Sequence, residues 1–147
     1  MLKKVLLLIT CIILLTGCSK TIEKFYLSDE FYNKGTFIKI KSDDLKNYKD
    51  KNYVIFTYNN FCSLSIPCDE IFQESMTNNK IDFLSISFEE FKKTELYKIV
   101  KYAPSIIVVK NNEIVAYLDA EKDSDLEKYQ DVDKFTEWLS KYIYLKK

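Results

Sequence analysis

Two cysteines, Cys62 and Cys68, are the residues of this sequence best suited to chemistry, and five residues separate them. In an oxidising compartment, two thiols so close in the chain are expected to pair for part of their life. Such a pair can exchange disulfides with another protein, or it can act as a structural clip. Two thiolates can also contribute to a metal site. The spacing alone does not decide among these uses.

The residue types missing from the chain exclude several other kinds of site. The 147 residues contain no His, and all 22 basic residues are Lys. Without His there is no Ser-His-Asp triad or His-ligated metal, and two thiolates need Asp69 or a second chain to complete a zinc site. Without Arg the bidentate phosphate clamp is absent, and 22 acids balance the bases, so no basic field favours nucleic acid. We therefore expect no cofactor, no metal and no nucleic-acid partner.

The N-terminus has the features of an export signal. Two Lys precede Val5–Leu15, an apolar run of 11 residues that is too short to span a bilayer. The next residues complete Leu15–Cys18 (LTGC), which resembles the lipobox of bacterial lipoproteins. This resemblance implies a signal peptide at residues 1–17 and a lipidated Cys18 on the extracytoplasmic face of a bacterial cell membrane. Residues 18–35 would be the lipidated N-terminus and tether, although their aromatic side chains leave open that the end of this segment packs on the domain.

From residue 36 to residue 147 the pattern predicts one domain of alternating strands and helices. Apolar, β-branched runs predict strands and helical spacing of apolar residues predicts helices. The expected strands are Thr36–Ile40, Tyr53–Tyr58, Ile81–Ile86, Ser105–Val109 and Glu113–Leu118, and the expected helices are Ser42–Tyr48, Cys68–Met76, Phe88–Lys101 and a final helix after Asp131. Alternation of this kind predicts an α/β fold with a mixed central sheet and helices on both faces.

Local signals mark the ends of several elements. Ser42 and Asp131 are expected to be N-caps, and Pro67 suits a first helical turn because it has no N–H to leave unpaired. Asn111-Asn112 is expected to form a tight hairpin turn, since Asn tolerates left-handed backbone. The acidic segment Asp119–Gln130 lacks the Gly of a calcium-binding loop and is expected to be a solvated loop.

This order of elements, with a Cys pair between the second strand and the second helix, resembles the thioredoxin fold. The resemblance covers about residues 36–144 and depends on three stretches: Tyr53–Cys68, Tyr102–Glu113 and the closing helix. Tyr102–Glu113 (YAPSIIVVKNNE) is the most specific, because it is similar to the thioredoxin run in which a cis-proline opens a strand that ends in a tight turn. The resemblance implies a thioredoxin-like three-layer sandwich.

The same resemblance implies roles for the Cys segment. Aligned from the left, Phe61-Cys62 matches the aromatic residue and the attacking Cys of thioredoxins. Aligned from the right, Pro67-Cys68 matches the Pro and the resolving Cys, and Ser65 takes the place of the nucleophile. Because both ends fit, we favour a three-residue insertion within the loop, with Cys62 and Cys68 as the catalytic pair.

Substrate recognition is expected at the residues around the predicted cis-proline. Pro104 would face the Cys pair, and Ala103 and Ser105 would flank the edge that pairs with a bound polypeptide. Together with Phe61, these residues form the predicted substrate-binding set. The partners implied are the thiols or disulfides of exported proteins, or another envelope protein.

Two departures from the thioredoxin pattern bear on activity. Thioredoxins carry a buried acid beneath the thiols that helps to move protons, and counting back from Cys62 places Phe56 there. Asp69 and Glu70 also oppose a thiolate, although the start of the predicted helix favours one. The leading hypothesis is thiol–disulfide exchange by a membrane-anchored extracytoplasmic protein. The alternative is a redox-silent binding or assembly module with a structural Cys62–Cys68 disulfide.

Overall fold

The structure is a computed structural model that describes residues 23–59 and 67–146. Five strands form one sheet in the order β1-β3-β2-β4-β5. The strands are β1 (Phe37–Lys39), β2 (Tyr53–Tyr58), β3 (Phe83–Ser87), β4 (Ser105–Lys110) and β5 (Glu113–Tyr117). They coincide with the five predicted strands to within two residues at either end, because each predicted run carries apolar side chains that lie in the core or pack against it.

The sheet is mixed, as the alternation of elements predicted. Strands β1 and β2 both pair in parallel with β3, whereas β4 runs antiparallel to β2 and to β5. The β4–β5 hairpin turns at Asn111 and Asn112, whose φ angles of 49° and 66° confirm the predicted left-handed turn. The central position of β2 explains why Tyr53 to Thr57 are all buried.

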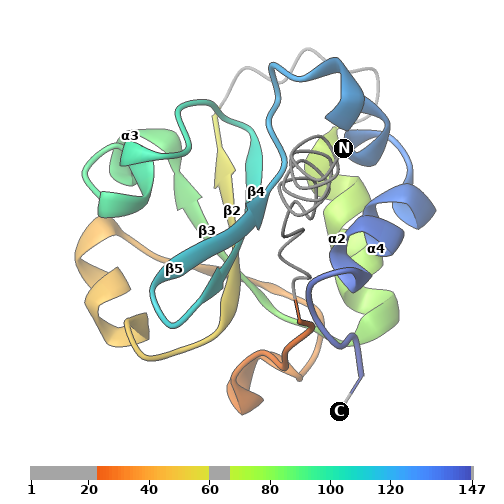
Figure 1. The fold of residues 1–147 in the computed structure, drawn as a ribbon, viewed down its shortest axis with the longest axis horizontal. Helices are drawn as coiled ribbons and strands as arrows, with labels where there is room; N and C mark the ends of the chain where they lie inside the picture. The colour runs from red at the N-terminus through yellow and green to blue at the C-terminus, as the bar shows by residue number, and fades with distance from the viewer. Residues whose placement is uncertain (1–22, 60–66, 147) are drawn as a thin grey trace, which may run out of the picture.

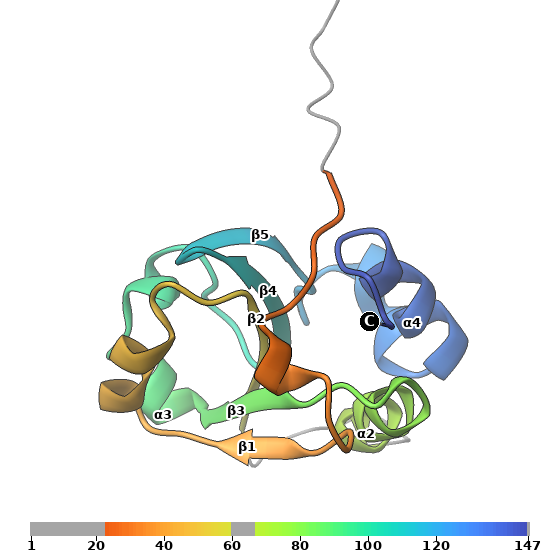
Figure 2. The ribbon, with the colours of Figure 1, turned by 90° about the horizontal axis from the view of Figure 1, so that it is seen from below.

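Helical segments cover both faces of the sheet (Figures 1 and 2). Helices α2 (Cys68–Asn79) and α4 (Val132–Ser140) lie side by side on one face. The short helix α3 (Phe88–Phe91) and the 3-10 helix η2 (Ser42–Tyr48) lie on the other. Three further 3-10 helices, η1 (Asp29–Phe31), η3 (Glu95–Lys98) and η4 (Asp123–Tyr129), lie in the connections. The result is the three-layer α/β architecture expected from the sequence.

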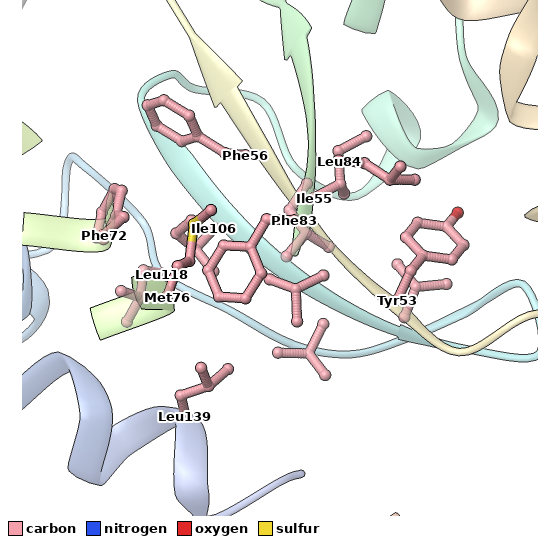
Figure 3. Close-up of a cluster of buried hydrophobic side chains, with 14 of the residues drawn as sticks. Tyr53, Ile55, Phe56, Phe72, Met76, Phe83, Leu84, Ile106, Leu118 and Leu139 are labelled. Atoms are coloured by element: carbon pink, nitrogen blue, oxygen red, sulfur yellow. The ribbon is translucent and has the colours of Figure 1, made fainter. Parts of the chain in front are cut away.

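The main core lies between the sheet and the α2–α4 layer. Figure 3 shows Phe72 and Met76 of α2 and Leu139 of α4 close to the apolar side chains of the strands. The rings of Phe72 and Phe56 are 5.3 Å apart between centroids, in an edge-to-face arrangement. This packing fixes α2, and with it the residue at its first position, against the middle of the sheet.

The predicted helix Phe88–Lys101 is wrong, because the chain forms two short helical pieces there. Helix α3 ends at Phe91, and η3 follows from Glu95 to Lys98. The Thr94 hydroxyl donates to the carbonyl of Phe91 at 2.8 Å, and the Thr94 N–H donates to the same oxygen at 2.9 Å. Phe91 and Leu96 are five positions apart and do not share one face of a straight helix, so the chain turns between them and buries both.

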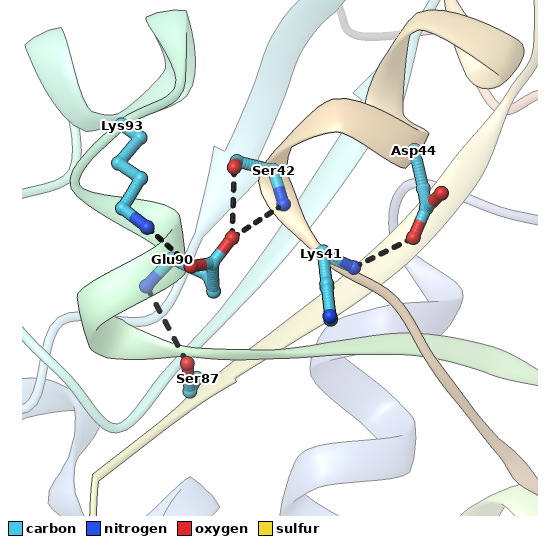
Figure 4. Close-up of polar contacts among 6 residues, drawn as sticks. All are labelled: Lys41, Ser42, Asp44, Ser87, Glu90 and Lys93. Atoms are coloured by element: carbon cyan, nitrogen blue, oxygen red, sulfur yellow. Dashed lines mark hydrogen bonds and ion pairs between the residues drawn. The ribbon is translucent and has the colours of Figure 1, made fainter.

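The predicted cap at Ser42 is also wrong (Figure 4). The residue before η2 is Lys41, and its N–H donates to the Asp44 carboxylate at 2.8 Å. The Ser42 N–H and hydroxyl instead donate to Glu90, at 3.0 and 2.8 Å, and so tie η2 to α3. By contrast the predicted cap of α4 is confirmed, since the Asp131 carboxylate accepts from the Lys134 N–H at 2.9 Å.

The folded unit begins before Thr36, where the sequence placed its start. Phe25, Leu27 and Phe31 are buried in the core, and the backbone of Phe25 pairs with the segment around Ile143. The described end of the predicted tether therefore packs on the domain, which the aromatic residues of that segment had left open. The predicted signal peptide at residues 1–17 and the predicted lipidation site Cys18 lie outside the described residues. In the ranges that are described, no helix is long and apolar enough to cross a bilayer.

Asp82 joins the first strand to its parallel neighbour. One carboxylate oxygen, Oδ1, accepts from the Gly35 N–H at 2.8 Å, from the Thr36 N–H at 2.7 Å and from the Thr36 hydroxyl at 3.2 Å. Gly35 has φ of +78°, and a β-carbon there would lie 2.5 Å from the Met76 carbonyl oxygen. The close approach to α2 and the left-handed backbone together require glycine at this position.

Candidate functional site

A cavity of about 270 Å³ opens at the carboxyl end of β2, beside the start of α2. Its walls come from β1, β2, β3, the first residues of α2 and the residue before β4. The lining residues are Phe37, Lys39, Phe56, Tyr58, Asn59, Cys68, Asp69, Ser85 and Pro104. The fold therefore brings two of the predicted site residues, Cys68 and Pro104, into one cavity.

Cys68 is the first residue of α2 and follows Pro67, the N-cap. Its side chain is 2% exposed, so the prediction that Cys68 lies just inside the helix and is covered is confirmed. The unpaired N–H groups of a helix start favour a negative charge, whereas the exposed Asp69 carboxylate in the same turn opposes one. Phe61 and Cys62 lie outside the described residues, and their place in the site stays a prediction.

The peptide bond between Ala103 and Pro104 is cis, as predicted. Two hydrogen bonds hold this segment against its neighbours. The Asn59 side-chain amide donates to the Ala103 carbonyl at 2.9 Å, and the Tyr129 hydroxyl donates to the Pro104 carbonyl at 3.0 Å. Burial raises the pKa of Tyr129, so its hydroxyl remains protonated and available as a donor. The end of β2 and the cis-proline are therefore tied together at the cavity.

The other two residues predicted to flank the substrate edge do not line the cavity. Ser105 is fully buried within the sheet, and its hydroxyl donates to the Leu118 carbonyl. Ala103 is half-buried, and its carbonyl accepts from Asn59. Of the three predicted residues Ala103, Pro104 and Ser105, only Pro104 lines the cavity.

Phe56 forms part of the cavity wall at the position where the resemblance would place a buried acid. Its ring lies 5.3 Å, between centroids, from the rings of both Phe37 and Phe72. The only carboxylate that lines this cavity among the described residues is that of Asp69, which is exposed at the start of α2. The absence of an acid beneath the thiols, inferred from the sequence, therefore holds for the described part of the cavity.

Five lining residues were not predicted as site residues from the sequence: Phe37, Lys39, Tyr58, Asn59 and Ser85. Lys39 and Ser85 are the polar pair among them that lies on two neighbouring strands. Lys39 is exposed on β1, whereas Ser85 is buried on β3. They are direct partners in the parallel register of these strands, and Phe56 is the partner of Ser85 on the other side. Only the pairing of strands far apart in the sequence brings them to Cys68, and no local motif signals it.

The sequence itself matches no family model and no curated protein. Solved structures do match. One, a protein with a thioredoxin fold, gives a TM-score of 0.53 at 16% identity and covers 72% of this chain and 96% of its own. The fold is thioredoxin-like. A mutant thioredoxin from Halobacterium salinarum NRC-1 gives a TM-score of 0.51 at 14% identity and covers 75% of this chain and 93% of its own. The thioredoxin-like sandwich predicted from the sequence is confirmed.

Proposed function

We propose that this chain is a membrane-anchored, extracytoplasmic thioredoxin-like protein that exchanges disulfides with exported proteins through Cys62 and Cys68. The observation that carries the proposal is the cavity shared by Cys68 and the cis-proline Pro104. Cys62 follows Asn59, which also lines this cavity, by three residues. Three residues span at most roughly 11 Å, so the Cα atom of Cys62 lies within that distance of the Cα atom of Asn59. These facts support a working pair at the end of β2.

The exchange uses both sulfurs in turn. The Cys62 thiolate attacks a disulfide of the exported protein, a mixed disulfide forms, and one sulfur of the substrate leaves as a thiolate. The Cys68 thiolate then attacks the Cys62 sulfur and releases the second substrate sulfur. The substrate disulfide is thereby reduced and the Cys62–Cys68 disulfide is formed, and the reverse sequence oxidises a dithiol. The start of α2 favours the Cys68 thiolate in the second step.

The position of the N-terminal segment supports attachment through a lipid on Cys18. The Tyr26 carbonyl accepts from the side chain of Asn52, which immediately precedes β2. The cavity is at the other end of this six-residue strand, roughly 20 Å away. A chain that leaves for the membrane near Tyr26 would therefore leave the cavity open to proteins outside the membrane.

The second candidate function is a redox-silent binding or assembly module in which a Cys62–Cys68 disulfide is structural. Phe56 favours this candidate, because an apolar ring in place of the buried acid removes a proton carrier for the exchange. The Asp69 carboxylate beside Cys68 also acts against a thiolate. A clip predicts that reduction lowers the melting temperature of the protein and that no turnover occurs.

The deciding experiment compares Cys62→Ser with Ser65→Ala in the full-length protein, using transfer of a disulfide to or from a model substrate. We expect Cys62→Ser to abolish exchange and to leave the fold intact by circular dichroism. Ser65→Ala is the matched control and should retain exchange. Ser65 takes the place of the nucleophile only in the alternative alignment of the Cys segment. Full activity of Cys62→Ser, or no activity of the unaltered protein, would refute the proposal.

A further inference from the structure

Three neighbouring strands place a row of unlike side chains beside Cys68. Lys39 on β1 pairs with Ser85 on β3, and Ser85 pairs with Phe56 on β2. Registered partners in parallel strands point to the same face and lie about 4.8 Å apart. All three residues line the cavity together with Cys68. The row therefore offers a cation, a hydroxyl and an aromatic ring side by side.

The Ser85 hydroxyl is the unusual member of this row. Ser85 is 4% exposed, and among the described residues its Oγ is the one buried side-chain nitrogen or oxygen atom without a hydrogen-bond partner. Nearly all buried polar groups in native proteins are paired, so an unpaired one that lines a cavity calls for an explanation. A hydrogen-bonding group of a ligand in the cavity would supply the missing partner.

The charges around the cavity favour an anionic group over a cationic one. Lys39 is a cavity-lining cation that forms no ion pair within the part of the chain that the structure describes. Helix α2 has 12 residues, and its first residue, Cys68, lines the same cavity. The N–H groups at the start of this helix add a partial positive charge there. Asp69 opposes these two, but its side chain is exposed.

The rest of the wall is aromatic. The Phe56 ring lies 5.3 Å from Phe37 and 6.0 Å from Tyr58, between centroids, so three rings line one side of the cavity. Such a wall suits a flat or apolar body. A volume of about 270 Å³ holds a group the size of a single large side chain.

We propose that this cavity binds a carboxylate carried on an apolar body. Ser85 would donate a hydrogen bond to the carboxylate, Lys39 would supply the countercharge, and the aromatic wall would hold the apolar body. The carboxylate can belong to an exchanging polypeptide or to a free organic acid. The inference deepens the proposed function, because it uses the same cavity, but it does not need Cys62.

The test measures binding of sodium benzoate to the full-length protein by isothermal titration calorimetry, with neutral benzamide of the same shape as the control. We expect benzoate to bind in the millimolar range and benzamide at least fivefold more weakly. Ser85→Ala and Lys39→Met should each weaken benzoate at least threefold. Asp69→Asn should strengthen it. Lys41→Met, which removes a nearby Lys outside this cavity, should change nothing.

A pair of short peptides separates the two sources of the carboxylate. One ends in a phenylalanine with a free carboxylate, and the other is the same peptide with a C-terminal amide. Tighter binding of the free-acid peptide than of benzoate assigns the cavity to a polypeptide, and binding of benzoate alone assigns it to a small acid. No binding of either, or equal binding to the protein and to Ser85→Ala and Lys39→Met, would overturn the proposal.

The same titration separates this proposal from the proposed exchange activity. The Cys62→Ser variant, which should lack exchange, is expected to bind benzoate as the unaltered protein does. If exchange is absent in the unaltered protein and benzoate binding still depends on Ser85 and Lys39, only the proposed exchange activity is refuted. If exchange is present and benzoate binding is insensitive to both residues, only the carboxylate site fails.

Discussion

Replacing Asp82 should show how strongly the first strand is held in the register that the cavity needs. In Asp82→Ala the N–H groups of Gly35 and Thr36 lose their common acceptor, which lies 2.8 and 2.7 Å away. Leaving a buried donor unpaired costs about 1–3 kcal/mol. That cost applies to the Gly35 N–H, which is buried. The Thr36 N–H is exposed, and loss of its hydrogen bond adds about 1 kcal/mol, so we expect a total loss of about 2–4 kcal/mol in the free energy of unfolding. Asp82→Asn keeps an acceptor oxygen and should cost only about 1 kcal/mol.

Urea denaturation at pH 7, followed by tryptophan fluorescence, measures this difference. The chain has one Trp, and Trp138 packs in the core on α4, so its emission reports unfolding. Asp82→Asn is the matched control, because it keeps the size of the side chain and one acceptor oxygen, whereas Asp82→Ala removes both acceptor oxygens. A loss below 0.5 kcal/mol in Asp82→Ala, or an equal loss in Asp82→Asn, would refute the reasoning that this carboxylate holds β1 to β3.

Three further predictions test other contacts. Tyr129→Phe removes the hydrogen bond to Pro104 and should lower the free energy of unfolding by about 1 kcal/mol in urea denaturation; an unchanged value contradicts it. The hydrogen bond from Lys93 makes the largest contribution, followed by those from Ser42, and together they lower the pKa of Glu90 from 4.5 to about 2. The Glu90 carboxylate should therefore stabilise the fold above pH 4.5 and lose this effect as the pH falls to 2, so the melting temperatures of Glu90→Gln and the unaltered protein should differ at pH 7 and converge near pH 2. Gly35→Ala would place a β-carbon 2.5 Å from a backbone oxygen of α2 at a φ of +78°, so we expect a loss of about 2 kcal/mol or more, and a stability within 0.5 kcal/mol of the unaltered protein would contradict it.

The sequence predicted the strands well because their signals are local. The run Tyr53–Tyr58 is apolar throughout, and a strand buried on both faces needs such a run. The Asn111-Asn112 turn was predicted because few residues adopt positive φ, and the Asp131 cap because its carboxylate reaches the Lys134 N–H within one turn. Each of these features depends only on residues close together in the chain.

The errors arose where distant contacts outweigh local preference. Ser42 is a good N-cap residue by type, but Glu90 of another element accepts both of its hydrogen bonds. Within Phe88–Lys101 each half has helical character, yet burial of Phe91 and Leu96 requires a turn at Thr94. Neither outcome can be predicted without the packing of α3 against its neighbours.

The candidate site was predicted only in part, because short motifs identify some of its residues and strand pairing alone places the others. Cys68 and Pro104 could be identified from short motifs, and the structure brings both to one cavity. Lys39 and Ser85 carry no local signal of a site, since a Lys on an edge strand and a Ser on a central strand are ordinary residues. Their position beside Cys68 follows from the pairing of β1 with β3, which joins segments more than 40 residues apart.

The reduction potential of the Cys62–Cys68 pair tests the proposed exchange most directly. The full-length protein is equilibrated against glutathione or dithiothreitol buffers, and the fraction of paired thiols is measured at each ratio. Our account predicts a potential of roughly −120 to −270 mV, the range of proteins that exchange disulfides, and its value would distinguish an oxidant from a reductant. A potential below about −300 mV would mark a structural disulfide and contradict the exchange activity.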